Sequence, residues 1–305
     1  MALTIVPLLH LNLSRDTPVE FGSEFLLVPL PEWVKTDELL PNLGFQTAQN
    51  VKSARHCLLA KYEAKSIGEA DPSWTGQSYR SIQNDKSEAA AMANLALWIM
   101  EPSAVCYTAV LHALDWRVPG QSEPQAIIQQ LETHTPLYCH PDDVGREPSI
   151  AQIKAAGKLF DALRLIGRKN PVWTAARSFW AALVTPERDI RYSLFWIGIE
   201  ALLGPDNSSG EITYKLSQRI AFLTAKDPAD AKQIFDLARK CYGMRSTIVH
   251  GRWDDDPKMN DLMGATERIV RFSFHRILRD EEFLKKFQSK GRDKFLEEMV
   301  FSRYG

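Results

Sequence analysis

An arginine and a histidine, which are side chains that bind anions and carry protons, lie close together in this chain of 305 residues. Arg245 and His250 fall within the segment Cys241–Gly251, and Ser246 lies between them. A guanidinium group binds anionic oxygens through paired hydrogen bonds, and an imidazole gains or loses a proton near neutral pH. The segment therefore has the side chains for acid–base chemistry beside a bound anion.

The spacing of Arg245 and His250 decides whether their side chains meet. Apolar residues at three- and four-residue steps predict a helix over Ala229–Ile248, and Gly251 is a natural stop after it. Five positions on a regular helix turn a side chain by about 140°, so the two would not face one another. Convergence therefore requires a bend between them or a second copy of the site across a dimer.

A carboxylate on an apolar helix is a further candidate. The helix expected over Arg188–Leu203 is apolar on nearly all sides, which is typical of a central, buried helix. Glu200 lies near its C-terminal end, where the helix dipole disfavours negative charge. Because a buried, unpaired carboxylate is costly, Glu200 needs a cationic partner. Arg245 is the favoured partner, and Arg191 on the same helix is the alternative.

The elements that must position these residues form an all-helical C-terminal half. Helical periodicity, interrupted by Pro and Gly, continues from residue 168 to the end of the chain. The expected helices cover Val172–Val184, Arg188–Leu203, Ile212–Thr224, Ala229–Ile248, a segment from Asp256-Pro257 to about Leu278, and an amphipathic stretch over Glu281–Gly305.

The N-terminal half has a mixed pattern, and the expected fold class is therefore α+β. A mixed α/β domain over residues 1–167 would precede a helical bundle over residues 168–305, with the boundary in the turn-rich Gly167–Pro171. The expected elements are strands in Leu3–Leu13 and Val19–Pro29, a helix over Lys86–Met100, a buried strand or short helix in Ala104–Trp116, and a helix over Ile150–Ile166.

Composition narrows the classes of function. The formal charge of −1 gives no protein-wide basic field, so nucleic-acid binding would need a local patch or dimerisation. No apolar run approaches the ~18 residues of a membrane span, and the four scattered cysteines indicate reduced thiols. We expect a cytoplasmic protein with no membrane span. The His, Cys and acidic residues around Tyr138–Asp143 fit no zinc pattern, so we expect neither metal nor cofactor.

Two segments, Arg191–Leu203 and Tyr242–Gly251, together resemble the Apea-like branch of the HEPN domains (higher eukaryotes and prokaryotes nucleotide-binding). The family's motif is an arginine, a polar residue and, after three to five more positions, a histidine. It is matched here by Arg245, Ser246 and His250, and the aromatic and aliphatic helix that precedes it is matched by Trp196 and Glu200. The resemblance covers about residues 172–280, which is under half of the chain.

The resemblance implies a dimerising bundle of four or five helices, with two Arg–His motifs in one cleft. It implies a metal-independent endoribonuclease of a prokaryotic defence or toxin-type system. His250 would act as general base or acid at the 2′-hydroxyl and the leaving 5′-oxygen, and Arg245 would stabilise phosphoryl charge. Ser246 would bind the phosphate or orient the histidine, and Glu200 would hold Arg245.

Further residues are candidates for RNA contact. Tyr242, Arg252 and Trp253 flank the motif, and the two rings would either stack on bases or pack in the core or dimer interface. A second cationic set is more typical of an ordinary amphipathic surface helix; it comprises Lys285, Lys286, Lys290, Arg292 and Lys294.

Other interpretations of the whole chain stay open. The helical half would alternatively be a non-catalytic module for dimerisation and for binding RNA or a protein partner, or a site for a nucleotide ligand. The N-terminal domain would sense a signal or bind a regulatory protein or ligand.

Overall fold

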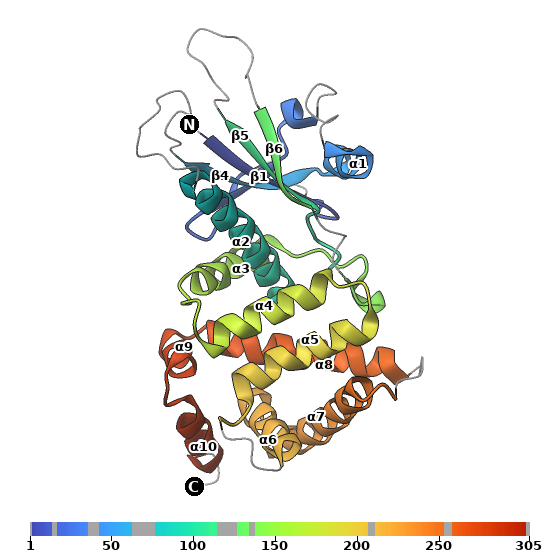
Figure 1. Ribbon diagram of the computed structural model, residues 1–305, viewed down its shortest axis with the longest axis vertical. Coiled ribbons are helices and arrows are strands. Elements are labelled where there is room, and N and C mark those ends of the chain that lie inside the picture. The colour runs from blue at the N-terminus through green and yellow to red at the C-terminus, as the bar shows by residue number, and fades with distance from the viewer. Residues whose placement is uncertain are drawn as a thin grey trace. The chain divides into compact units, whose positions relative to one another are not determined.

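The fold was analysed in a computed structural model, which describes residues 2–13, 17–35, 43–62, 77–114, 127–133, 138–206, 211–252 and 258–302. By its internal contacts the chain divides into two compact units, Met1–Asp161 and Ala162–Gly305. The first combines an antiparallel sheet with helices and the second is helical where described, so the fold class is α+β (Figure 1).

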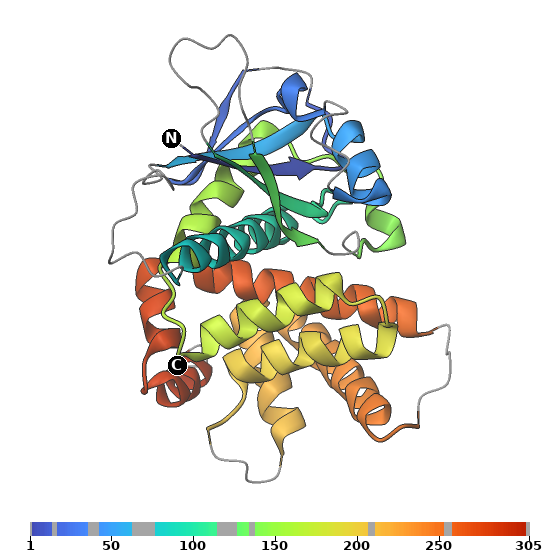
Figure 2. The same ribbon diagram turned by 45° about the horizontal axis from the view of Figure 1, so that its top comes forward.

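The N-terminal unit is built on a sheet in the strand order β2-β3-β4-β1-β5-β6. Its strands are β1 Ala2–Leu8, β2 Val19–Phe21, β3 Phe25–Pro29, β4 His56–Tyr62, β5 Ala109–Leu114 and β6 Ile127–Thr133. Its helices are α1 Phe45–Ser53, α2 Gln77–Met100 and α3 Ile150–Arg164, with short 3-10 turns η1 Glu32–Lys35 and η3 Pro141–Asp143. The α2 helix lies against β5 and β6 (Figure 2).

The first strand shows how one residue limits pairing in this sheet. β1 pairs with β4 along its whole length to Leu8, but its ladder with β5 ends at Ile5. Pro7 has no N–H to donate, so it cannot continue a ladder on both edges. The predicted strand over Leu3–Leu13 is therefore shorter than expected, although Leu9 still forms an isolated bridge with Cys106.

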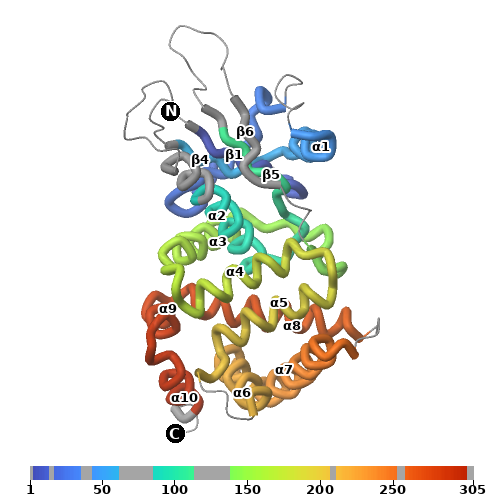
Figure 3. The backbone as a smooth tube through the Cα atoms, viewed as in Figure 1, coloured from blue at the N-terminus to red at the C-terminus, as the bar shows by residue number. Residues whose placement is uncertain are grey.

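The C-terminal unit contains the helices that the periodicity predicts. They are α4 Pro171–Val184, α5 Arg188–Leu203, α6 Ile212–Thr224, α7 Pro228–Val249, α8 Lys258–Leu278, α9 Glu281–Gln288 and α10 Arg292–Ser302 (Figure 3). The bounds of α5 and α6 agree with prediction. In its described part, the amphipathic stretch expected over Glu281–Gly305 forms two helices, because the chain breaks at Ser289–Gly291.

Helix α5 packs very closely on α4. A Cβ atom at Gly198 would lie 2.2 Å from Cε1 of Phe179, so only glycine allows this approach. The ring of Phe179 in turn contacts the ring of Phe274 on α8 edge-on, with 5.2 Å between centroids. Helix α5 is thereby packed tightly on one side, but Ile190 and Ile197 on its other side are 49% and 42% exposed, so the expectation of a helix that is buried on nearly all sides is wrong.

None of the helices in the described ranges is long and apolar enough to cross a membrane.

Candidate functional site

Glu200 forms an ion pair with Arg245, which is the partner that the sequence favoured. Nη2 of Arg245 lies 3.1 Å from Oε1 of Glu200 and 3.4 Å from Oε2. Arg191 instead donates to the carbonyl oxygens of Thr185 and Pro186, just before α5. Both Glu200 and Arg245 have side chains that are 24% exposed, so the expectation of a fully buried carboxylate is wrong. The ion pair is thus partly exposed, although Oε1 of Glu200 and Nε of Arg245 are themselves buried.

Tyr242 completes this cluster from within the core. Its ring meets Trp196 edge-on at 5.2 Å between centroids, and Cζ of Arg245 lies 5.7 Å from its centroid. Burial, followed by the charge of Glu200, raises the pKa of Tyr242 to about 12, and its hydrogen bond with Glu200 contributes. The residue is only 7% exposed. The ring of Tyr242 therefore has no free face on which a base could stack. Its contacts are those of a residue that positions Glu200 and Arg245.

A buried tyrosine fixes the register of α7 on α5. The hydroxyl of Tyr192 donates to the carbonyl oxygen of Cys241 at 2.8 Å, and both residues are buried. Because the cost of leaving a buried hydroxyl unpaired is large, this bond disfavours sliding of the two helices. The relative position of Glu200 and Arg245 is therefore set by contacts inside the unit.

His250 terminates α7 in a glycine-based cap. Gly251 has φ +65° and donates to the carbonyl of Ile248 at 2.9 Å, while Arg252 donates to that of Thr247 at 3.1 Å. This pair of bonds is the Schellman arrangement, which favours glycine after the cap residue. It confirms Gly251 as the stop signal. His250 is exposed at the C-terminal end of α7.

Within one chain, Arg245 and His250 do not face one another. Helix α7 runs without a break to Val249, so of the two alternatives for convergence, a bend or a second copy, the structure shows no break of the helix between the two residues. The side chain of Arg245 turns to Glu200 on α5, whereas His250 and Arg252 lie exposed at the helix end. The β-branched residues before His250 do not loosen the helix, since the glycine cap satisfies its last carbonyls.

The other predicted residues of the motif have these positions. Ser246 is partly buried on α7, and its carbonyl accepts the backbone N–H of His250 at 3.1 Å. Trp253 lies outside the described residues, as does the Asp256-Pro257 pair expected to begin α8.

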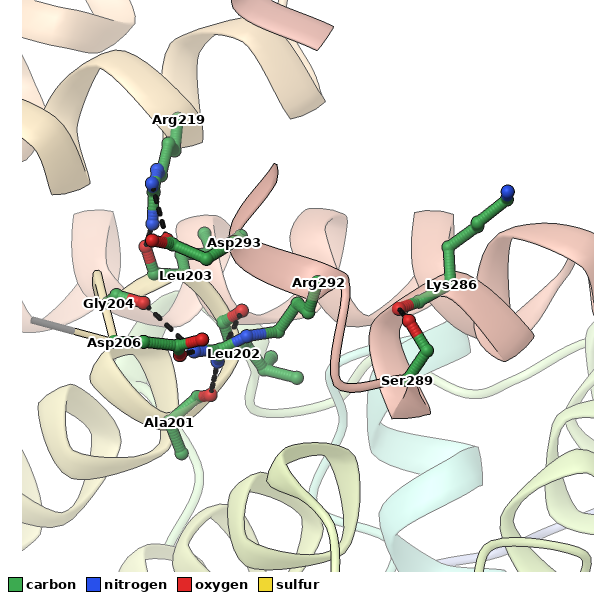
Figure 4. A network of polar contacts seen from close by, with 10 residues as sticks. All are labelled: Ala201, Leu202, Leu203, Gly204, Asp206, Arg219, Lys286, Ser289, Arg292 and Asp293. Atoms are coloured by element: carbon green, nitrogen blue, oxygen red, sulfur yellow. Dashed lines mark hydrogen bonds and ion pairs between the residues drawn. The ribbon is translucent and has the colours of Figure 1, made fainter. Parts of the chain in front are cut away.

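Arg292 and Arg219, which the sequence did not predict to lie here, cap the C-terminal end of α5 (Figure 4). Arg292 donates to the carbonyls of Ala201, Leu202 and Gly204, with distances of 3.1 Å to the last two. Arg219 donates to the carbonyl of Leu203 at 2.9 Å. Each also pairs with a carboxylate, Asp206 for Arg292 and Asp293 for Arg219.

These contacts explain how Glu200 is tolerated at a helix C-terminus. The last carbonyls of a helix have no intrahelical donor and carry partial negative charge. Arg292 and Arg219 supply both donors and positive charge directly beyond Glu200. Arg292 is 6% exposed, so the expectation that it lies on the surface of an amphipathic helix is wrong for this residue, and it is not free to contact a phosphate. The sequence signal for Arg219 is its place beside the apolar stripe of Leu216, Ile220 and Leu223.

Two grooves between described residues of this unit are lined by neither Glu200 nor Arg245. One of about 260 Å³ lies between α6 and α7 and is lined by Tyr214 and Phe235. Another of about 340 Å³ is lined by Lys215, Arg219 and Glu297. Within the described residues, no three His, Cys, Asp or Glu side chains are arranged to hold a metal ion.

Comparisons of the chain with known protein families, with curated proteins and with solved structures gave no match.

Proposed function

We propose that this protein is a metal-independent endoribonuclease whose site is completed by a second copy of the chain. The observation that carries the proposal is the partly exposed Arg245, held at 3.1 Å by Glu200 and flanked by Tyr242. A guanidinium fixed in this way binds a phosphodiester with little loss of side-chain freedom.

In the proposed reaction, His250 takes the proton of an RNA 2′-hydroxyl. The 2′-oxygen attacks the neighbouring phosphorus, and the bond from phosphorus to the 5′-oxygen breaks. A protonated histidine gives its proton to that 5′-oxygen, so the products are a 2′,3′-cyclic phosphate and a 5′-hydroxyl. Arg245 stabilises the charge that develops on the phosphoryl oxygens.

The geometry of α7 supports the need for two chains. One histidine cannot remove and supply protons in the same step, and His250 lies on a different side of α7 from Arg245. His250 is exposed at a helix end, where a second copy can reach it. A symmetric pair would supply two histidines and two arginines to one cleft. A role in prokaryotic defence or as a toxin, with the N-terminal unit regulating the site, belongs to this proposal through the family resemblance.

The test is cleavage of labelled RNA in EDTA by the native chain, His250→Ala and Arg245→Ala. Loss of the general base lowers the rate by about 10²–10⁴-fold. Arg245→Lys should not restore activity, since an ammonium lacks the bidentate fork. Arg239→Ala on the exposed face of the same helix is the matched control and should keep the native rate. Equal cleavage by all variants, or none by the native chain, would refute the proposal.

A non-catalytic role is the second candidate, and one observation favours it. In a single chain Arg245 is engaged by Glu200 and directed away from His250, so the described chain by itself holds no assembled catalytic site. In that case the helical unit would be a module for dimerisation and for binding RNA or a protein partner. RNA affinity that survives His250→Ala, with no cleavage product from either form, would identify this role.

A further inference from the structure

One face of α8 carries cations at helical spacing. Steps of three and four residues place the side chains of this set side by side along the helix. The opposite face, with Val270, Phe274 and Ile277, is buried. The basic face of α8 comprises Arg268, Arg271, Phe272, His275, Arg276 and Arg279.

Carboxylates do not neutralise the exposed arginines of the basic face. Among the residues that the structure describes, Arg268, Arg276 and Arg279 form no ion pair. Arg276 contacts the ring of Phe283 instead, with its Cζ 5.5 Å from the centroid. The acidic neighbour in sequence, Glu267, is 4% exposed and belongs to the buried side of α8.

The carboxylates that follow α8 are engaged elsewhere. Asp280 caps α9 by accepting the backbone N–H of Phe283 at 3.0 Å. Glu281 pairs with Lys285 at 2.7 Å. Glu282 also acts on Lys285 through its charge. Arg268, Arg276 and Arg279 therefore have no carboxylate partner among the described residues.

His275 is the partly buried histidine of the basic face, and its pKa responds to the positive charge around it. Burial, and then the charges of Arg279 and Arg271, lower the pKa of His275. An anion bound at the face would oppose this effect and raise that pKa again. The titration of His275 is thus a local readout of anion binding.

The positive surface extends to α7, the helix of the proposed catalytic residues. Burial raises the pKa of Cys241 on α7, and the charges of Arg268 and Lys240 oppose that rise. Sγ of Cys241 also lies 3.8 Å from the carbonyl oxygen of Leu262 on α8. Arg268, at one end of the basic face, therefore lies near Cys241 on α7, the helix that also carries Arg245.

Phe272 indicates which polyanion fits. It is 58% exposed in the middle of the arginines. An exposed ring among cations is the composition of surfaces that bind single strands, because bases stack on the ring while cations contact phosphates. An acidic peptide needs the charge but not the flat ring.

We propose that the basic face of α8 binds the backbone and one unstacked base of single-stranded RNA, and so holds the substrate beside α7. RNA as the ligand rests on the proposed function. The face runs about 16 Å from Arg268 to Arg279 at 1.5 Å per residue. This length spans a few nucleotides of an extended strand.

The experiment measures binding of a labelled single-stranded RNA oligonucleotide across a salt series, with His250→Ala in every chain to prevent cleavage. The test variant also carries Arg268→Gln, Arg276→Gln and Arg279→Gln. The matched control carries Lys158→Gln, Lys232→Gln and Lys294→Gln, three exposed cations on α3, α7 and α10. Circular dichroism and the melting temperature confirm that both triple variants are folded.

The test variant is expected to bind at least about tenfold more weakly. Its slope of log affinity against log salt should be smaller by about 2, since each phosphate contact contributes about 0.7 for a single strand. Phe272→Ala should weaken binding by roughly 5- to 150-fold without changing the slope. The control triple variant should keep native affinity and slope, and RNA should raise the pKa of His275 as followed by NMR.

Equal binding by the test and control triple variants would overturn this assignment. Preference for duplex DNA, or for anionic lipid vesicles, over single-stranded RNA would also overturn it. The outcome is separable from that of the proposed function. Binding of RNA through α8 without cleavage by the native chain would refute the ribonuclease proposal alone. Cleavage by the native chain that the test substitutions do not change would refute only the proposal that the basic face binds RNA.

Discussion

Tyr242 is the residue that connects the core of the C-terminal unit to its ion pair. With a pKa of about 12, its hydroxyl stays protonated at physiological pH and keeps donating to Glu200. Its ring also contacts Arg245 on one side and Trp196 on the other. The position of the guanidinium thus depends on an aromatic residue as much as on the carboxylate that pairs with it.

The clearest pH dependence belongs to a histidine of the N-terminal unit. His112 on β5 is 1% exposed, and burial lowers its pKa to about 4 from an ordinary value near 6.5. Between these values the unfolded chain binds a proton that the folded chain does not, so the free energy of unfolding falls as pH falls. The loss should reach about 3 kcal/mol near pH 4, at 1.36 kcal/mol per pKa unit.

Urea unfolding at pH 7, 5.5 and 4.5 measures this dependence, and His112→Gln is the comparison. The variant lacks the titrating group, so its free energy of unfolding should fall less over the same range. The same pH slope in both proteins would show that His112 is not responsible.

At the scale of elements, two glycines of neighbouring helices should respond oppositely to alanine. Gly198→Ala would place Cβ 2.2 Å from Phe179, and relieving the clash should cost about 1–3 kcal/mol of stability. At Gly243, on the exposed side of α7, a Cβ would meet nothing within 4 Å. Gly243→Ala should therefore stabilise the protein by about 0.5–1 kcal/mol. Urea unfolding distinguishes the two, and equal effects would contradict the packing of α4 on α5.

The helices were predictable because their signals are local. Pro171 and Pro228 begin helices, Gly204 and Gly251 follow the ends of α5 and α7, and the spacing of apolar residues supplies the rest. The strands β4 and β6 and the helix α1 were not predicted. β4 forms by pairing with β1 and β3 from distant parts of the sequence, and its seven residues give no strong alternation on their own.

The candidate site was predictable in part for a similar reason. A carboxylate on an apolar helix demands a cation, and this requirement identified the pairing of Glu200 with Arg245. The contact of Arg292 with the end of α5 could not be predicted from the sequence, because its acceptors are backbone carbonyls about 90 residues away. The absence of a bend before His250 was also unpredictable, since the cap geometry depends on φ at Gly251.

For the whole molecule, a nearly neutral chain has an uneven distribution of charge. The net charge is −1, yet four arginines of α8 lie within twelve residues on one face. A local surface of this kind supplies what the overall balance does not. It also means that affinity for RNA would be strongly salt-dependent even though the isoelectric point is ordinary.

If two chains share one site that uses both histidines, a His250→Ala chain should inactivate a native chain that pairs with it. Mixing native chains with an excess of His250→Ala chains, under conditions that exchange subunits, should therefore lower the RNA cleavage per native chain. The same mixture before subunit exchange is the control. Unchanged cleavage per native chain, with subunit exchange shown by differently labelled chains, would contradict a shared site.

The closure of α5 by Arg292 has a consequence for the order of events during synthesis. Ala201 and Gly204 receive their donor from a residue made 88 to 91 positions later. At roughly 5–20 residues per second, the ribosome needs about 4–18 s to reach it. During that interval the nascent C-terminal unit has an unfinished helix end beside Glu200. The chain would therefore complete the C-terminal end of α5 only after Arg292 has been synthesised.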